Sequence, residues 1–210
     1  MITGFKMVND FLWPESDVDC AAVVFDRVVD LELAKLHCNH YNAVIQAGGN
    51  AGVWPKWLGK RFKTVYTFEP EPSNFYCLAH NCPEQNIIKI QAALGFERKL
   101  VGIGLEEGFR NMGACNVNGS GVIPIIRIDD LMLEQCDLIQ LDIEGYEFEA
   151  LRGADRTLRR CRPILMLEDK GLSEKYGTEK GWIEKYVQSY EYYVVDRVER
   201  DIIFAPKESA

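Results

Sequence analysis

Short apolar, β-rich runs alternate with amphipathic helical stretches from residue 42 onward. The runs with the length and residue types of buried strands are Ala43–Ala47, Thr64–Phe68, Ile87–Gln91, Leu138–Leu141 and Ile164–Leu167. The helices predicted between them cover Trp54–Phe62, Ser73–Asn81 and Glu147–Arg160. Strands that alternate with helices in this way form βαβ units, whose strands lie parallel in a sheet with helices on both faces. The sequence therefore predicts a doubly wound α/β fold with a mostly parallel sheet.

Both ends of the chain depart from this alternation. Apolar residues at three-and-four spacing from Val18 predict an amphipathic helix to about Leu36, which Ser16 or Asp17 can cap. We therefore interpret residues 1–41 as an N-terminal helical extension and residues 42–206 as the main domain. At the other end, Tyr190–Val195 and Ile202–Ala205 flank the charged segment Asp196–Asp201 and predict an antiparallel hairpin at one sheet edge. The glycine-rich residues 96–126 predict an inserted strand-and-loop elaboration over the edge that carries the site.

Composition narrows the class of protein. The 24 basic and 32 acidic side chains give a formal net charge of −8, which disfavours non-specific binding to a phosphate backbone. The seven cysteines form no CxxC pair and no regular framework, so we expect reduced thiols and a cytoplasmic protein. The N-terminus lacks the apolar core of a signal peptide, and no apolar run is long enough to span a membrane.

A glycine loop and an acidic residue follow the first two predicted strands. In a doubly wound sheet, ligands bind beyond the carboxyl ends of the strands. The loop at residues 46–52 is rich in glycine, which allows a sharp turn and a close approach to a ligand. Glu69 ends the second strand twenty-one residues after Gly48, an offset at which a carboxylate can accept both hydroxyls of a ribose. The nucleoside need not belong to NAD, because Asn50 and Val53 stand where the dinucleotide fingerprint has glycine.

Several segments together resemble the FkbM family of class I S-adenosylmethionine-dependent methyltransferases, which are Rossmann-like. The segments that carry the resemblance are Val44–Gly52, Thr67–Pro70, Ile128–Leu131, Asp137–Glu147 and Pro163–Glu168. Many members of that family are thought to be O-methyltransferases. The resemblance covers about residues 42–170 and makes residues 42–206 a methyltransferase domain.

The resemblance implies where S-adenosylmethionine binds. The methionine part would lie along the glycine loop, the ribose at Glu69, the adenine beside Ala92 or Ala93, and the methyl sulfonium near Asp142. The candidate cofactor-binding residues are therefore Gln46, Gly48, Gly49, Asn50, Gly52, Glu69, Pro70, Ala92 and Asp142. Gln46 stands where the family usually has an acidic residue, and its carbonyl can still accept a hydrogen bond from the methionine ammonium. Gly49 stands where the family usually has alanine.

Carboxylates gather after the fourth and fifth predicted strands. Asp142, Glu144 and Glu147 follow the fourth strand, and Glu168 and Asp169 end the fifth. Asp142, Glu144, Glu168 and Asp169 are the candidate catalytic residues, whereas Glu147 is as well explained as a first-turn helix residue. Three roles stay open for the cluster: a general base for a substrate hydroxyl, ligands of a hard divalent ion such as Mg²⁺, or a partner for the positive end of the cofactor.

The histidines favour a carboxylate or lysine as the base. His37 and His40 precede the first strand, at the edge opposite the predicted site, and His80 lies late in a helix that points away. A histidine base is therefore not expected, and we expect one of the carboxylates or Lys170 to accept the proton of the substrate hydroxyl.

The leading hypothesis is methyl transfer from S-adenosylmethionine to a hydroxyl of a small-molecule or glycan acceptor, with no membrane partner. One alternative is an RNA ribose or other nucleic-acid methyltransferase, although the chain contains neither Pro-Pro nor Pro-Cys, which base-modifying enzymes use. A second alternative is a methyltransferase-like domain that binds a ligand without catalysis, for which Gln46 is the only support. The acceptor, the metal dependence and the oligomeric state stay open.

Overall fold

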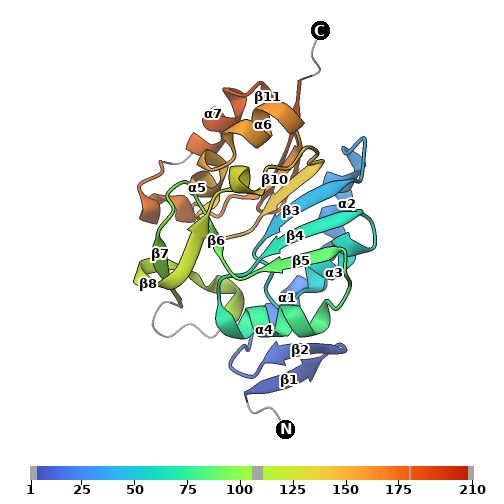
Figure 1. The fold of residues 1–210 in the computed structure, drawn as a ribbon, viewed down its shortest axis with the longest axis vertical. Coiled ribbons are helices and arrows are strands. Elements are labelled where there is room, and N and C mark those ends of the chain that lie inside the picture. The colour runs from blue at the N-terminus through green and yellow to red at the C-terminus, as the bar shows by residue number, and fades with distance from the viewer. Residues whose placement is uncertain (1–3, 106–110, 180, 208–210) are drawn as a thin grey trace.

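The computed structural model describes residues 4–105, 111–179 and 181–207. At its centre is a seven-stranded sheet in the order β11-β12-β10-β9-β3-β4-β5 (Figure 1). The parallel strands are β3 (Ala43–Ala47), β4 (Thr64–Phe68), β5 (Ile87–Ile90), β9 (Leu138–Leu141) and β10 (Ile164–Glu168). The antiparallel edge is the hairpin of β11 (Tyr192–Val198) and β12 (Asp201–Pro206). The prediction of a doubly wound, mostly parallel sheet with a C-terminal hairpin is confirmed.

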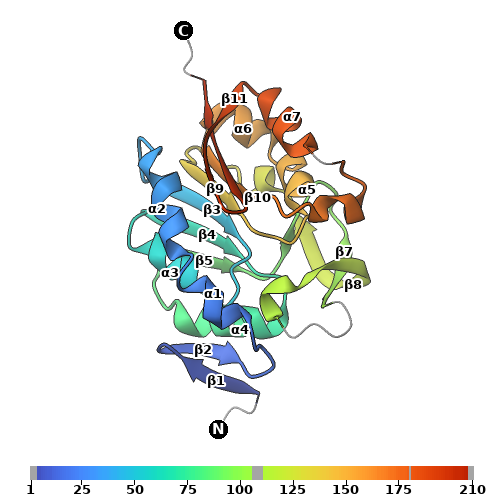
Figure 2. The same cartoon turned by 180° about the vertical axis from the view of Figure 1, so that it is seen from behind.

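Helices cover both faces of this sheet (Figures 1 and 2). One layer consists of α2 (Val28–Leu36), α3 (Val53–Gly59) and α4 (Pro72–Asn81), and the other of α5 (Glu147–Arg152), α6 (Asp155–Cys161) and α7 (Trp182–Gln188). Successive strand residues point to opposite faces, so that Val44 packs with the first layer and Ile45 with the second. Burial on both faces explains the continuous apolar runs that mark these strands in the sequence.

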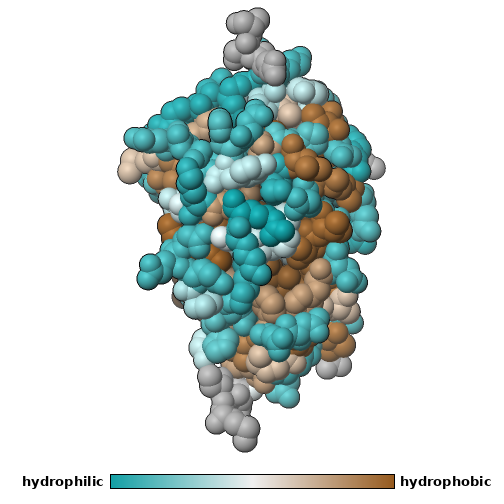
Figure 3. All heavy atoms as spheres, turned by 90° about the vertical axis from the view of Figure 1, so that its right-hand side faces the viewer, coloured by the Kyte–Doolittle hydropathy of each residue, from teal (hydrophilic) through white to brown (hydrophobic). Residues whose placement is uncertain are grey.

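The N-terminal extension differs from the predicted single helix. It opens with a hairpin, β1 (Phe5–Val8) and β2 (Phe11–Pro14), whose turn holds Asn9 and Asp10 at positive φ. Two short helices follow, α1 (Cys20–Val24) and α2, with a break between them at Arg27. The break brings the guanidinium of Arg27 to Asp201, a contact between residues far apart in the sequence that helical periodicity does not encode. Figure 3 shows the face that carries α2, where apolar side chains gather; Val29 and Leu36 of this helix are exposed.

The helix predicted over residues 147–160 is also two helices, α5 and α6, separated at Gly153. A short 3-10 helix, Ile128–Leu131, lies against the junction. Its Asp129 carboxylate accepts hydrogen bonds from the backbone N–H groups of Arg156 and Thr157 at 3.0 and 2.9 Å. This distant carboxylate satisfies donors in the first turn of α6 and so starts a new helix.

The inserted segment forms a second, smaller sheet together with β6 (Ala93–Leu94), which precedes it. The strands of the insertion are β7 (Leu100–Gly104) and β8 (Asn116–Ile126), the order is β6-β8-β7, and a 3-10 turn at Met112–Ala114 precedes β8. A further 3-10 helix, Leu172–Tyr176, follows β10. The C-terminal hairpin turns at Glu199 and Arg200, not over the whole of Asp196–Asp201, because a bulge near Asp196 lets the strand continue through the charged residues. Within the described residues, no helix is long and apolar enough to cross a membrane.

Candidate active site

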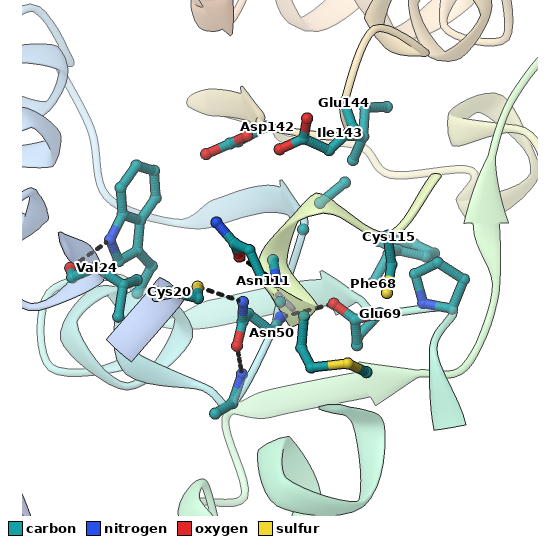
Figure 4. A pocket seen from close by; sticks show the side chains of 18 of the residues that line it. Cys20, Val24, Asn50, Phe68, Glu69, Asn111, Cys115, Asp142, Ile143 and Glu144 are labelled. Atoms are coloured by element: carbon teal, nitrogen blue, oxygen red, sulfur yellow. Dashed lines mark hydrogen bonds between the residues drawn. The ribbon is translucent and has the colours of Figure 1, made fainter. Parts of the chain in front are cut away.

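A cavity of about 310 Å³ opens at the carboxyl ends of β3, β4 and β9. The strand order reverses between β3 and β9, which is the position where ligands bind in doubly wound sheets. Its walls come from the loops after β3, β4, β5 and β9, from α1, and from the segment Asn111–Val117 (Figure 4). The N-terminal extension and the inserted segment therefore complete a site whose floor is the central sheet.

The glycine loop forms one wall and allows no larger residue at Gly48. Gly48 has φ of +86°, and a Cβ there would lie 2.0 Å from the backbone oxygen of Asp142. Asn50 has φ of 47° and turns the loop toward α3, which begins after Gly52. Glycine is required at 48 by both backbone conformation and lack of space.

Glu69 occupies the position expected of a ribose-binding carboxylate. It lines the cavity at 5% exposure, and its two oxygens accept hydrogen bonds from the N–H groups of Asn50 at 2.7 Å and Glu71 at 2.8 Å. A carboxylate has about four acceptor positions, so two stay available for the hydroxyls of a ribose. Burial raises the pKa of Glu69 to about 7. A buried carboxylate that faces a cavity with spare acceptor capacity fits S-adenosylmethionine.

Most of the other predicted cofactor residues also line the cavity: Gly48, Gly49, Asn50, Pro70, Ala92 and Asp142. Gln46 and Gly52 lie outside this lining. The side chain of Gln46 is fully buried beneath the loop, where it accepts a hydrogen bond from Thr67 Oγ1 and donates one to the carbonyl of Gly48 at 3.0 Å. The structure places Gln46 as a brace of the glycine loop, while its contact with the cofactor stays a prediction.

Asp142, Glu144 and Glu168 form a cluster, with one carboxylate oxygen from each within 4.8 Å of the others. Asp142 and Glu144 line the cavity, whereas Glu168 lies behind them at 2% exposure. Lys170 reaches all three: its Nζ is 2.8 Å from Glu168, 2.9 Å from Glu144 and 3.9 Å from Asp142. Oxygen donors in this number suit a hard divalent ion, and the ammonium of Lys170 supplies positive charge at the same place.

The charge of this cluster is set by burial and by the closeness of its members. Burial, followed by the neighbouring charge of Asp142, raises the pKa of Glu168, and burial also raises the pKa of Glu144. Repulsion between carboxylates this close therefore adds to burial in favouring the protonated form of Glu168. The Glu168 side chain is 2% exposed, whereas Asp142 faces the cavity at 26%.

Arg27 is a site residue that the sequence analysis missed. It lines the cavity from the break between α1 and α2, with Nε 3.2 Å from Asp30 and Nη1 3.6 Å from Glu168. Its Nη2 binds Asp201 on β12 at 2.5 Å. Arg27 thus brings a second cation to the back of the carboxylate cluster.

Asp169 and Glu147, the other two acidic residues predicted near this edge, do not line the cavity. Asp169 Oδ1 accepts from the N–H of Gly171 at 3.1 Å, which turns the side chain into its own loop. Glu147 is buried and accepts from the N–H groups of Ile143 and Gly145 at 2.9 and 3.3 Å, and burial raises its pKa to about 7. Glu147 therefore supports the turn after β9.

The structure places the histidines away from the site. His37 follows the last turn of α2, His40 is exposed, and His80 lies in the last turn of α4. Among the described residues that line the cavity there is no histidine. Although burial opposes it, the charges of Asp142, Glu168 and Glu144 raise the pKa of Lys170, which also lines the cavity, so Lys170 keeps its proton. The carboxylates of Glu69, Asp142 and Glu144 are cavity groups that can accept a proton.

Solved structures define the class to which this fold belongs. The chain is similar to the FkbM methyltransferase from Methylobacillus flagellatus KT, with a TM-score of 0.54 and 19% identity over 78% of this chain and 43% of that one. It is also similar to the precorrin-6y C5,15-methyltransferase from Geobacter metallireducens GS-15, with a TM-score of 0.51 and 13% identity over 93% and 92% of the two chains. The fold is therefore that of a class I methyltransferase.

The sequence then gives the family. Residues 46–194 match the methyltransferase FkbM domain, and the chain belongs to that family of S-adenosylmethionine-dependent methyltransferases. A curated relative, Methyltransferase 1 of Beauveria bassiana (strain ARSEF 2860), is 24% identical over 144 residues, which cover 53% of this chain and 58% of the relative. The chain thus spans little more than half of that relative and 43% of the Methylobacillus structure.

Proposed function

We propose that this chain transfers the methyl group of S-adenosylmethionine to a hydroxyl oxygen of a small-molecule or glycan acceptor. The observation that carries the proposal is the position of Asp142, which faces the cavity at 26% side-chain exposure with Glu168 and Lys170 behind it. A cavity-facing carboxylate next to the expected methyl position is the group that transfer to a hydroxyl needs, because the hydroxyl must lose a proton.

The residues have separate roles in this proposal. Bound S-adenosylmethionine supplies an electrophilic methyl group on a sulfonium. Asp142 accepts the hydroxyl proton as the new carbon–oxygen bond forms and the carbon–sulfur bond breaks, which leaves a methyl ether and S-adenosylhomocysteine. The ammonium of Lys170 holds Asp142 and Glu144 in place. The rest of the rate enhancement is alignment of donor and acceptor.

The rim of the cavity supports a hydroxyl-rich acceptor. Glu199 and Arg200 line the cavity from the turn between β11 and β12, three strands from β3 in the sheet order. Charged groups of both signs can donate to and accept from sugar hydroxyls. A net charge of −8 gives no support to RNA as the acceptor.

The test is transfer of a labelled methyl group from S-adenosylmethionine to panels of monosaccharides, oligosaccharides, small alcohols and phenols, with a structured RNA as a further arm. We expect a base-stable methyl ether from an acceptor with a free hydroxyl. The variant Asp142→Asn should lose transfer while it still binds S-adenosylhomocysteine. A base-labile methyl ester, an N-methyl product or a product from RNA alone would contradict the proposal.

A further inference from the structure

Hydrogen bonds to two other parts of the chain hold the segment Asn111–Cys115 against the cavity. The backbone N–H of Met112 donates to Asp17 Oδ1 at 2.7 Å, and the carbonyl of Met112 accepts from Asn74 Nδ2 at 2.9 Å. Asp17 and Asn74 are 0% and 1% exposed, and the other oxygen of Asp17 accepts from Trp13 Nε1 at 2.7 Å. Buried polar groups from two distant parts of the chain therefore hold this segment in one position.

Asn111 presents its amide nitrogen to the cavity. Its Oδ1 accepts from the N–H of Gly113 at 2.8 Å, and this contact fixes which end of the amide faces inward. Figure 4 shows the Asn111 side chain between Asn50 of the glycine loop and Asp142. Gly113 lies against the same loop, since a Cβ there would be 3.2 Å from Asn50 Nδ2.

The glycine loop has no backbone donor left for an anionic ligand. The N–H groups of Gly48 and Gly49 both donate to the Phe68 carbonyl, at 3.1 and 2.9 Å. The N–H of Asn50 donates to the Glu69 carboxylate at 2.7 Å, and the N–H of Ala51 donates to Asn50 Oδ1 at 2.6 Å. The N–H of Gly52 donates to the Gly49 carbonyl at 2.9 Å. The cations Arg27 and Lys170 are each paired with carboxylates, and Arg200 lines the cavity from the turn between β11 and β12, three strands from β3 in the sheet order. In the loop itself, Asn50 Nδ2 donates to Cys20 Sγ at 3.1 Å. A ligand carboxylate beside the glycine loop only accepts hydrogen bonds, so a side-chain donor from a neighbouring element suits it.

We propose that Asn111 Nδ2 donates a hydrogen bond to the carboxylate of the methionine part of S-adenosylmethionine. The chemistry matches, because an amide N–H pairs with a carboxylate and the glycine loop along which the methionine is expected to lie has its backbone N–H groups already engaged. Asn111 is therefore a cofactor-binding residue, and the inserted segment is part of the cofactor site. This assignment rests on the S-adenosylmethionine dependence of the family and is independent of the acceptor.

The test compares two probes by calorimetry: S-adenosylmethionine, and decarboxylated S-adenosylmethionine, which keeps the sulfonium and amine but lacks the carboxylate. Asn111→Ala should weaken binding of S-adenosylmethionine by roughly 10- to 100-fold, the range for loss of a hydrogen bond to a charged group. Binding of the decarboxylated probe should change less than about twofold, because it has no carboxylate to lose a partner. Asn111→Asp should weaken the binding of S-adenosylmethionine further, because the carboxylate of the new side chain repels that of the cofactor. It should not weaken the binding of the decarboxylated probe.

The matched control is Asn116→Ala, at the start of β8 next to this segment, where Nδ2 donates to the carbonyl of Ala114 and Asn116 does not line the cavity. This variant should bind both probes like the unaltered protein, and thermal unfolding should show that all three variants fold. Equal weakening of both probes by Asn111→Ala, or no weakening of either, would overturn the proposal. So would a variant whose affinity for S-adenosylmethionine is intact and whose KM for the acceptor alone is raised.

Discussion

Lys170 Nζ lies 2.8 Å from Glu168 Oε2, so the buried end of β10 is held by a cation from the loop that follows it. The same ammonium is 3.9 Å from Asp142, the carboxylate that faces the cavity. The buried glutamate, the lysine and the cavity-facing aspartate therefore form one charged unit. A change of charge at any one of them alters the electrostatic potential at the other two.

The first prediction concerns Asp142. Asp142→Asn keeps the size of the side chain and removes the proton acceptor, so kcat should fall by at least about 100-fold, with the Kd of S-adenosylhomocysteine changed only slightly. Asp169→Asn is the matched control, because Asp169 is an acidic residue of the same sheet edge whose side chain lies outside the cavity lining. Its kcat should stay within about threefold of the unaltered enzyme. Equal losses in the two variants would remove Asp142 from its role as base.

The second prediction concerns metal ions. Because the ammonium of Lys170 supplies positive charge among Asp142, Glu144 and Glu168, we expect turnover to survive EDTA. Lys170→Met removes this charge and leaves three carboxylates within 4.8 Å of one another, so the variant should gain affinity for Mn²⁺ in calorimetry. Loss of turnover in EDTA that Mg²⁺ restores would show instead that a divalent ion binds beside the lysine.

The third prediction concerns the pH dependence of cofactor binding. Burial raises the pKa of Glu69 to about 7, and the ionised form is the better acceptor for ribose hydroxyls. At pH 6 only about a tenth of Glu69 is ionised, so the Kd of S-adenosylhomocysteine should be up to about 10-fold weaker than at pH 8. Glu69→Gln should weaken binding at pH 8 and flatten the dependence. A Kd that is the same at both pH values in the unaltered protein would contradict a role for ionised Glu69.

The sequence predicted the central sheet well because its strands are buried on both faces. The runs 43–47, 64–68 and 138–141 match β3, β4 and β9 residue for residue, since strands covered on both faces are largely apolar. Gln46 in β3 and Gln140 in β9 are buried polar exceptions. The carboxyl ends of these strands fixed the place of the site, so Glu69 and Asp142 could be named before the fold was known. Residues at strand ends have a position that topology determines.

Features that depend on contacts between distant residues could not be predicted. The break before α2 follows from the contact of Arg27 with Asp201, and the break before α6 from the contact of Asp129 with Thr157. The sequence also cannot show that Glu168 joins the carboxylate cluster while Asp169 points away from it. These two residues are the last residue of a strand and the first residue after it, and which of them faces the site depends on where the backbone turns. Asn111 lies in a segment without periodicity, and its place in the cavity depends on the buried Asp17 and Asn74.

The last prediction concerns stability and Glu147, whose carboxylate accepts two backbone N–H groups in the turn after β9. Burial raises its pKa from 4.5 to about 7 in the folded protein. The folded state therefore binds a proton more tightly than the unfolded state, and the contribution of Glu147 to stability is full below pH 4.5 and is lost as the pH rises through 7. Glu147→Gln cannot ionise, so the free energy of unfolding of the variant minus that of the unaltered protein should rise by about 3 kcal/mol between pH 4.5 and pH 8. Urea denaturation at several pH values measures this difference, with the exposed Glu134→Gln as a control that should show no such rise. A difference for Glu147→Gln that is constant with pH would mean that the pKa of Glu147 is the same in the folded and unfolded states.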